Sequence, residues 1–91
     1  MTENNIAISS LAMDLKRVAV GYYGGSRKTA KRFSLEVLER RTEIKEESVK
    51  PYLRKFLKKL PEMLSNKDES KIAEDALMYS TILQNYALHN Q

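Results

Sequence analysis

The amino-acid sequence predicts an all-α protein, a single-domain antiparallel four-helix bundle. Apolar residues recur every three or four positions in four segments of roughly 14–20 residues, which is the period of an amphipathic helix. Only short polar stretches separate these segments, and short connections favour antiparallel neighbours. Ninety-one residues supply one hydrophobic core, so we expect residues 1–91 to form one domain.

The first helix is expected over residues 5–23. Its apolar residues keep the helical period without a break: Ile8, Leu11, Ala12, Leu15, Val18, Ala19 and Tyr22. Asn4 or Asn5 would cap its N-terminus. The stretch RVAVGYY also has the β-branched and aromatic residues of a strand, but the unbroken period favours a helix. Gly24 and Gly25 are expected to end it, because glycine readily adopts the left-handed conformation found at helix C-termini.

Ser26 is expected to cap a second helix over residues 26–42. The inner face of this helix carries Ala30, Phe33, Val37 and, near its end, Ile44. The glycines before it do not form a nucleotide-binding P-loop, because Gly21 precedes Gly25 by four residues and the motif GxxxxGK[ST] requires five. We therefore interpret the segment as a tight turn between two helices.

The third helix is expected over residues 48–64, with Pro51 in its first turn, where the missing N–H costs little. Pro61 would either bend this helix or begin a short last turn. Its apolar face comprises Val49, Tyr52, Leu53, Phe56, Leu57, Leu60 and Leu64.

The fourth helix is expected over residues 69–88, capped by Asn66 or Asp68. No charged residue follows Asp75, and the apolar residues point to three sides of the helix: Ala76, Tyr79, Leu83 and Tyr86 to one, Met78 and Ile82 to another, and Leu77 and Leu88 to a third. A helix that is apolar most of the way round must be buried all round, whereas a bundle helix keeps one face in solvent.

We therefore expect a homo-oligomer, most simply a dimer, with Leu77, Met78, Ile82 and Tyr86 in the interface. A second apolar stripe on the first helix, formed by Ile6, Met13 and Val20, supports this expectation. The alternative is that these are scattered exposed apolar side chains, which are common on protein surfaces.

Charge is distributed unevenly along the sequence. Residues 16–59 carry fourteen Lys and Arg residues and five Glu residues, a net charge of +9. The remainder carries two cations and seven acids, a net charge of −5. A basic middle between acidic ends suits an anionic partner. A solvated helical surface with many ion pairs would have the same composition, so this alternative stays open.

The predicted anion-binding residues of the second helix are Arg27, Lys28, Lys31 and Arg32. The first two would lie in the first turn, where the helix dipole disfavours cations by about 0.3–1 kcal/mol each. An anion bound at this N-terminus would offset that cost. The alternative is that these cations only solubilise a mobile turn.

The predicted anion-binding residues of the third helix are Lys50, Arg54, Lys55, Lys58 and Lys59. No acid lies between Glu47 and Glu62 to neutralise them. Like charges four residues apart destabilise a helix by about 0.2–0.5 kcal/mol per pair, so stability does not explain this face. It suits the phosphates of a nucleic acid. The helix dipole would favour the last two cations near the C-terminus, which explains part of the pattern without a ligand.

Residues 35–53, LEVLERRTEIKEESVKPYL, place apolar and small residues as a helix-turn-helix DNA-binding motif does: Leu38, Thr42, Ile44, Val49, Tyr52 and Leu53. The segment resembles that family, which implies a recognition helix whose N-terminal residues enter the major groove. Glu39 and Glu43 stand where the family prefers a small residue and a turn glycine, and Glu46 and Glu47 would face the DNA.

We expect no catalytic residues, no metal site and no cofactor. The sequence has no Cys, and His89 is its one histidine. Without disulfides a cytoplasmic location is expected. The N-terminus MTENNIAISS lacks the basic region of a signal peptide, and no apolar stretch is long enough to span a membrane.

These observations predict a small non-enzymatic module that binds an acidic partner through helices two and three, and nucleic acid is the favoured partner. The alternative is a homo-oligomeric adaptor that works through its apolar C-terminal helix and whose cations serve solubility.

Overall fold

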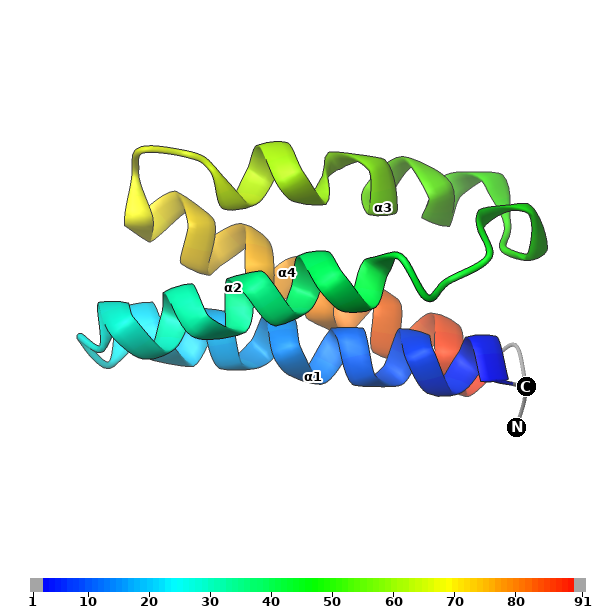
Figure 1. Ribbon diagram of the computed structural model, residues 1–91, viewed down its shortest axis with the longest axis horizontal. Helices are drawn as coiled ribbons and strands as arrows, with labels where there is room; N and C mark the ends of the chain where they lie inside the picture. Colours follow the sequence, from blue (N-terminus) through cyan, green and yellow to red (C-terminus); the bar gives the residue numbers. More distant parts are fainter. Residues whose placement is uncertain (1–2, 90–91) are drawn as a thin grey trace.

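The computed structural model describes residues 3–89 of the chain. They form four helices, α1 (Glu3–Tyr23), α2 (Arg27–Arg41), α3 (Pro51–Leu64) and α4 (Glu69–His89), with a single 3₁₀ turn, η1 (Glu46–Ser48), between α2 and α3. Successive helices run in opposite directions along the long axis (Figure 1), and α1 packs against both α2 and α4. The predicted antiparallel four-helix bundle is therefore confirmed. Residues 1–2 and 90–91 of the predicted domain lie outside the described residues.

The predicted helix boundaries agree with the structure within three residues, and the largest difference is at the start of α3. This helix begins at Pro51 and not at Ser48, because residues 46–48 form η1 instead. Lys50 has an extended backbone, with φ −64° and ψ 148°. A residue that precedes proline is disfavoured in the helical region, so Pro51 fixes the start of α3. Pro61 lies inside α3, which continues to Leu64.

The turn between α1 and α2 has the predicted geometry. Gly25 adopts a positive φ of 78°. The Ser26 Oγ accepts a hydrogen bond from the Thr29 N–H, with an N–O distance of 3.4 Å. The cap of α4 also agrees with the prediction, because the Asp68 Oδ1 accepts from the Ser70 N–H at 3.0 Å.

The predicted cap of α1 by Asn4 or Asn5 is wrong. Both residues lie within the helix, which includes Glu3. The Asn4 Oδ1 instead accepts a hydrogen bond from the backbone N–H of Lys45 at 3.0 Å. Asn4 therefore ties the first turn of α1 to the connection between α2 and α3.

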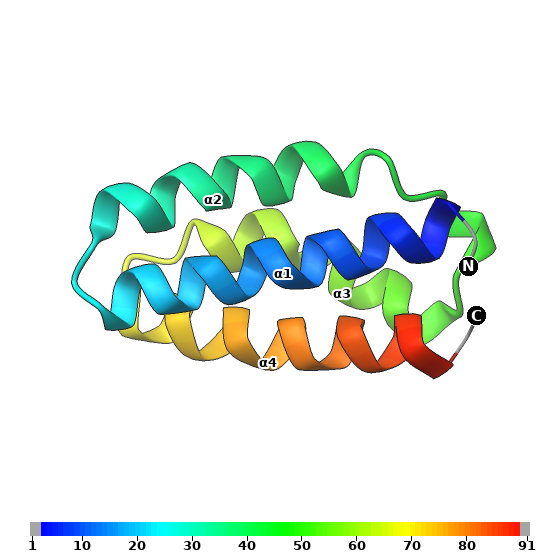
Figure 2. The ribbon, with the colours of Figure 1, turned by 90° about the horizontal axis from the view of Figure 1, so that it is seen from below.

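Small residues allow α1 to lie close to its two neighbours. A Cβ atom on Gly21 would lie 2.8 Å from the backbone nitrogen of Ala30, so α1 and α2 cross with no room for a side chain at that point. The Ser80 Oγ of α4 donates a hydrogen bond to the Ala12 carbonyl at 2.8 Å. In Figure 2, α1 lies between α2 and α4, and its start extends beyond the end of α2.

Large side chains fill the space beneath α3. Leu53, Leu57 and Leu60 are fully buried. Two aromatic pairs join α3 to α4 edge to face, with ring centroids 5.0 Å apart for Phe56 and Tyr79.

The second aromatic pair corrects one predicted core residue. Tyr52 was expected in the apolar face of the third helix, but 49% of it is exposed. Its ring lies at the edge of that face, beside α4, with its centroid 6.0 Å from that of Tyr86. Met63, absent from the predicted face, is buried, while Phe56 and Leu64 are half-buried.

Candidate nucleic-acid interface

The outer side of α3 carries three exposed lysines, Lys55, Lys58 and Lys59. Helical spacing directs them away from the buried leucines of the same helix. None of them makes an ion pair with any side chain that the structure describes. Lys50, at the residue before α3, is exposed in the same way. These four predicted site residues are therefore free to meet an anion.

The first two turns of α2 contribute Lys28, Lys31 and Arg32, all exposed. Because α2 and α3 are antiparallel, these residues lie at the same end of the bundle as the C-terminal half of α3 (Figure 1). The structure thus places them at the same end of the bundle as Lys58 and Lys59 (Figure 1), which follow them by more than twenty residues in the sequence. We name the combined set the basic face: Lys28, Lys31, Arg32, Lys50, Lys55, Lys58 and Lys59.

Arg27 does not belong to the basic face, although it was predicted there. Its Nε lies 2.6 Å from the Glu69 Oε2 at the start of α4. The hydrogen bond to Glu69 raises the pKa of the Arg27 guanidinium. The anion expected at the N-terminus of α2 is therefore this glutamate, which the sequence places 42 residues away.

Arg54 is also less available to bind an anion than predicted. Its side chain is half-buried, and its Nε donates a hydrogen bond to the Val49 carbonyl at 3.1 Å. The guanidinium thus satisfies a carbonyl just before α3 begins. Tyr52 and Phe56 face α4, so helical spacing places Arg54 on the opposite side of α3, toward α2.

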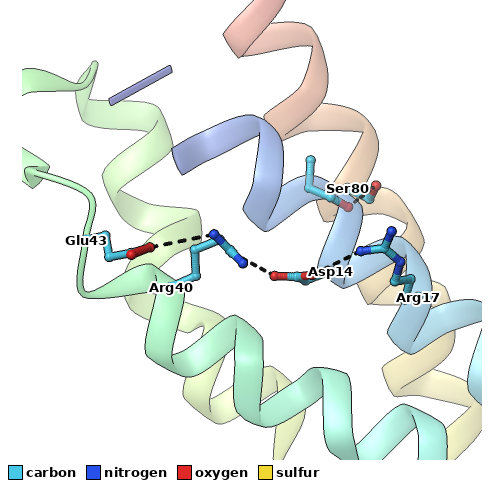
Figure 3. Close-up of polar contacts among 6 residues, drawn as sticks. Asp14, Arg17, Arg40, Glu43 and Ser80 are labelled. Atoms are coloured by element: carbon cyan, nitrogen blue, oxygen red, sulfur yellow. Dashed lines mark hydrogen bonds and ion pairs between the residues drawn. The ribbon is translucent and has the colours of Figure 1, made fainter. Parts of the chain in front are cut away.

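An ionic network around the buried carboxylate of Asp14, between α1 and α2, was not predicted. Asp14 is 2% exposed. Its Oδ2 accepts from the Arg40 Nε at 2.8 Å, and its Oδ1 lies 3.4 Å from a terminal nitrogen of Arg17 (Figure 3). Arg40 in turn approaches Glu43, with 3.8 Å between their nearest charged atoms (Figure 3). The hydrogen bond to Asp14 raises the pKa of Arg40.

This network has a structural role. A carboxylate removed from water requires a charged partner, and Arg40 meets it in only one register of α1 against α2. Asp14 falls among the buried positions of α1, and this break in the apolar pattern is the signal that could have revealed the network from sequence.

The predicted oligomer interface is partly exposed. Leu77 and Met78 are exposed and Ile82 is half-buried. Tyr86 is wrong as an interface residue, because it is 6% exposed and its Oη accepts a hydrogen bond from the Lys50 N–H at 3.1 Å. Further exposed apolar side chains of α1 and α4 are Ile6, Met13, Val20, Tyr23 and Leu88.

The arrangement of α2 and α3 differs from a helix-turn-helix. In that motif two helices meet at about 90–120° across a turn of three or four residues. Here α2 and α3 are antiparallel (Figure 1) and residues 42–50 connect them. Thr42 and Tyr52, which the resemblance places in the core, are exposed. The resemblance therefore does not extend to the fold.

Within residues 3–89, no group of three or more His, Cys, Asp or Glu side chains is placed to hold a metal ion. None of the described helices combines the length and apolarity that crossing a membrane requires. A hollow of about 700 Å³ lies at the end of the bundle where α1 begins and α4 ends, lined by residues that include Asn5, Arg40 and Tyr86. It does not coincide with the basic face.

Comparison with known proteins finds no match, whether to a family model, a curated protein or a solved structure.

Proposed function

We propose that this protein is a small non-enzymatic binding module that binds nucleic acid through the basic face of α2 and α3. The observation that carries the proposal is the state of Lys55, Lys58 and Lys59, which are exposed and have no ionic partner among the described side chains. When such cations neutralise phosphates, the nucleic acid releases its condensed counterions, and this release is the main driving force of non-specific binding.

The helix dipole explains little of this lysine cluster. Its effect is confined to the last turn of a helix. The last turn of α3 contains no basic residue, since the helix continues to Leu64. Lys58 and Lys59 therefore repel their neighbours without this compensation, which supports a role in binding.

Charge is also segregated along α2 in a way that supports the proposal. The first two turns carry the cations of the basic face and no acid, whereas toward the other end the charges of Glu36 and Glu39 are balanced by those of Arg40 and Arg41. These acids and Arg40 line a small hollow of their own. An anionic polymer would thus be attracted more strongly to the start of α2 than to its end.

Charge reversal on α3 tests the proposal. The double variant Lys55→Glu, Lys58→Glu changes two exposed residues and leaves Arg54 and its hydrogen bond in place. We expect it to abolish binding of a fluorescein-labelled 20-nucleotide DNA at 50 mM salt, measured by fluorescence anisotropy. The wild-type affinity should fall with salt at a log–log slope of about −0.7 to −0.9 per phosphate neutralised.

A matched control variant is Lys16→Glu, Lys45→Glu, which has the same net charge as the double variant. Both residues are exposed and lie outside the basic face. We expect this control to keep most of the wild-type affinity. Equal losses in the two double variants, or no binding by the wild type at 50 mM salt, would contradict the proposal.

A second candidate function, homo-oligomeric protein–protein interaction, is favoured by the exposed apolar side chains of α4. Met78 is 47% exposed and Leu77 is its exposed neighbour. We expect Met78→Glu to convert a dimer of the 10.5 kDa chain to a monomer, as measured by light scattering coupled to size exclusion. Met78→Leu is the control. If the wild type remains a monomer across a wide range of protein concentrations, this candidate is eliminated. The two functions are compatible, and the cytoplasm is the proposed compartment for either.

A further inference from the structure

Tyr52 is an aromatic side chain that is partly exposed on the surface of α3. Half of it is exposed, although it belongs to the apolar face by sequence. Its ring packs against Tyr86 at an interplanar angle of 68°, with 6.0 Å between the centroids. One part of the ring is thus supported by the protein, and the rest faces solvent.

The support under Tyr52 is itself fixed. Tyr86 is buried, and its hydroxyl accepts a hydrogen bond from the backbone N–H of Lys50, two residues before Tyr52. This bond joins the C-terminal part of α4 to the chain at the start of α3. Tyr52 therefore stands on a rigid base, which lowers the entropy lost when a flat ligand stacks on it.

Two lysines of the basic face share one side of α3 with this ring. Lys55 and Lys59 follow Tyr52 by three and seven positions, so the three side chains share one side of α3. Lys50 precedes it, and all three lysines are exposed. An exposed aromatic ring in a line of unpaired lysines is the combination that binds single-stranded nucleic acid, in which bases stack on aromatic rings and cations follow the backbone.

A duplex cannot use this ring in the same way. Its bases are already stacked on one another, so only its phosphates would meet the lysines. The stacking contact therefore discriminates between single-stranded and duplex nucleic acid. Base–aromatic stacking typically strengthens single-strand binding about 5- to 150-fold per base.

We propose that the basic face binds single-stranded nucleic acid, with one base stacked on Tyr52 and the backbone neutralised by Lys50, Lys55 and Lys59. This inference rests on the proposed function and narrows its substrate class from nucleic acid in general to single strands.

Substitution of Tyr52 tests the inference. Tyr52→Leu keeps an apolar side chain against Tyr86 and removes the aromatic ring, whereas Tyr52→Phe keeps the ring. The probes are a labelled 20-nucleotide thymidine strand and a 20-base-pair duplex at equal salt. We expect Tyr52→Leu to weaken binding of the single strand at least 5-fold and to leave duplex binding unchanged, while Tyr52→Phe retains the wild-type affinity for both.

A second measurement uses the wild-type protein and does not depend on how the variants fold. A single strand that contains bromodeoxyuridine is irradiated in the complex, and the crosslinked peptide is identified by mass spectrometry. We expect the crosslink at Tyr52 and not at Tyr23, which is exposed at the end of α1.

Three outcomes would overturn the inference. If Tyr52→Leu folds and binds the single strand as the wild type does, or if duplex affinity falls equally, Tyr52 is not a stacking platform. The same conclusion follows if the crosslink maps away from Tyr52. In all three cases the proposed function survives, whereas failure of the wild type to bind either probe at 50 mM salt would remove both.

Discussion

The helices α1 and α3 are held in the bundle by different kinds of side chain. α1 approaches α2 and α4 closely, through Gly21 against Ala30 and through the Ser80 hydrogen bond to Ala12. α3 rests on fully buried leucines and two aromatic pairs. Close backbone contact and a buried ion pair demand particular residues, whereas apolar packing mainly demands volume. The helix with the looser requirements, α3, carries Lys55, Lys58 and Lys59 of the basic face on its outer side.

The largest expected effect is on the leucines that hold α3. We expect Leu57→Ala to lower the free energy of unfolding by about 2–5 kcal/mol, because the substitution leaves a cavity in a fully buried site. Urea denaturation monitored by circular dichroism measures this loss. Leu57→Met, which nearly conserves volume, should cost less than about 1.5 kcal/mol. A similar loss in both variants would show that α3 is packed as strictly as α1.

A smaller loss is expected where α1 crosses α2. Gly21→Ala adds one methyl group that would lie 2.8 Å from the Ala30 backbone nitrogen, so the helices must move apart. We expect a loss of about 1–3 kcal/mol in the same assay, typical of an overpacked core. Alanine favours a helix over glycine by about 1 kcal/mol, so a gain in stability would mean that the two helices can separate freely.

The buried carboxylate gives the third prediction. Asp14→Asn removes the charge that Arg40 pairs with and preserves the side-chain shape. We expect a loss of about 1–2 kcal/mol, in the lower part of the range for charged hydrogen bonds because 34% of the Arg40 side chain is exposed to solvent. Arg40→Gln in the Asp14→Asn background should cost less than in the wild type, and additive losses in this double-mutant cycle would contradict direct coupling.

The smallest expected effect has the opposite sign. Lys55→Glu replaces repulsion of Lys58 and Lys59 with attraction, so we expect the free energy of unfolding to rise by about 0.5 kcal/mol. Lys16→Glu on α1 is the control, because no charged residue lies three or four positions away. Thermal melts at low salt measure the difference. If Lys55→Glu raises the stability and also weakens DNA binding, the lysine lowers the stability of the fold in exchange for binding. A variant that is less stable than the wild type would contradict this view.

The local features of the fold could be predicted from the sequence. The turn at Gly25, the Ser26 cap and the four apolar faces depend on residues within one or two turns of each other. Spacing also identified the exposed cations of α3, since a helix with a clean apolar face commits its other side to solvent.

The features that were missed depend on partners far away in the sequence. Arg27 and Glu69 are 42 residues apart, and Asp14 and Arg40 are 26 apart. Tyr86 has the spacing of both a core and an interface residue, and only its contacts with Lys50 and Tyr52 distinguish the two. Helical period gives the direction of a side chain but not the neighbour that it meets.

The antiparallel contact of α1 with α4 has a consequence for chain connectivity. The first turn of α1 and the last turn of α4 lie at the same end of the bundle (Figure 2), while the exposed turn at Gly24 and Gly25 lies at the other. A short designed linker could therefore join α4 to α1, and the chain could be opened at the glycine turn, in the order α2, α3, α4, α1. Such a circular permutant would keep all the helix–helix contacts described here, because new termini at an exposed turn interrupt little packing.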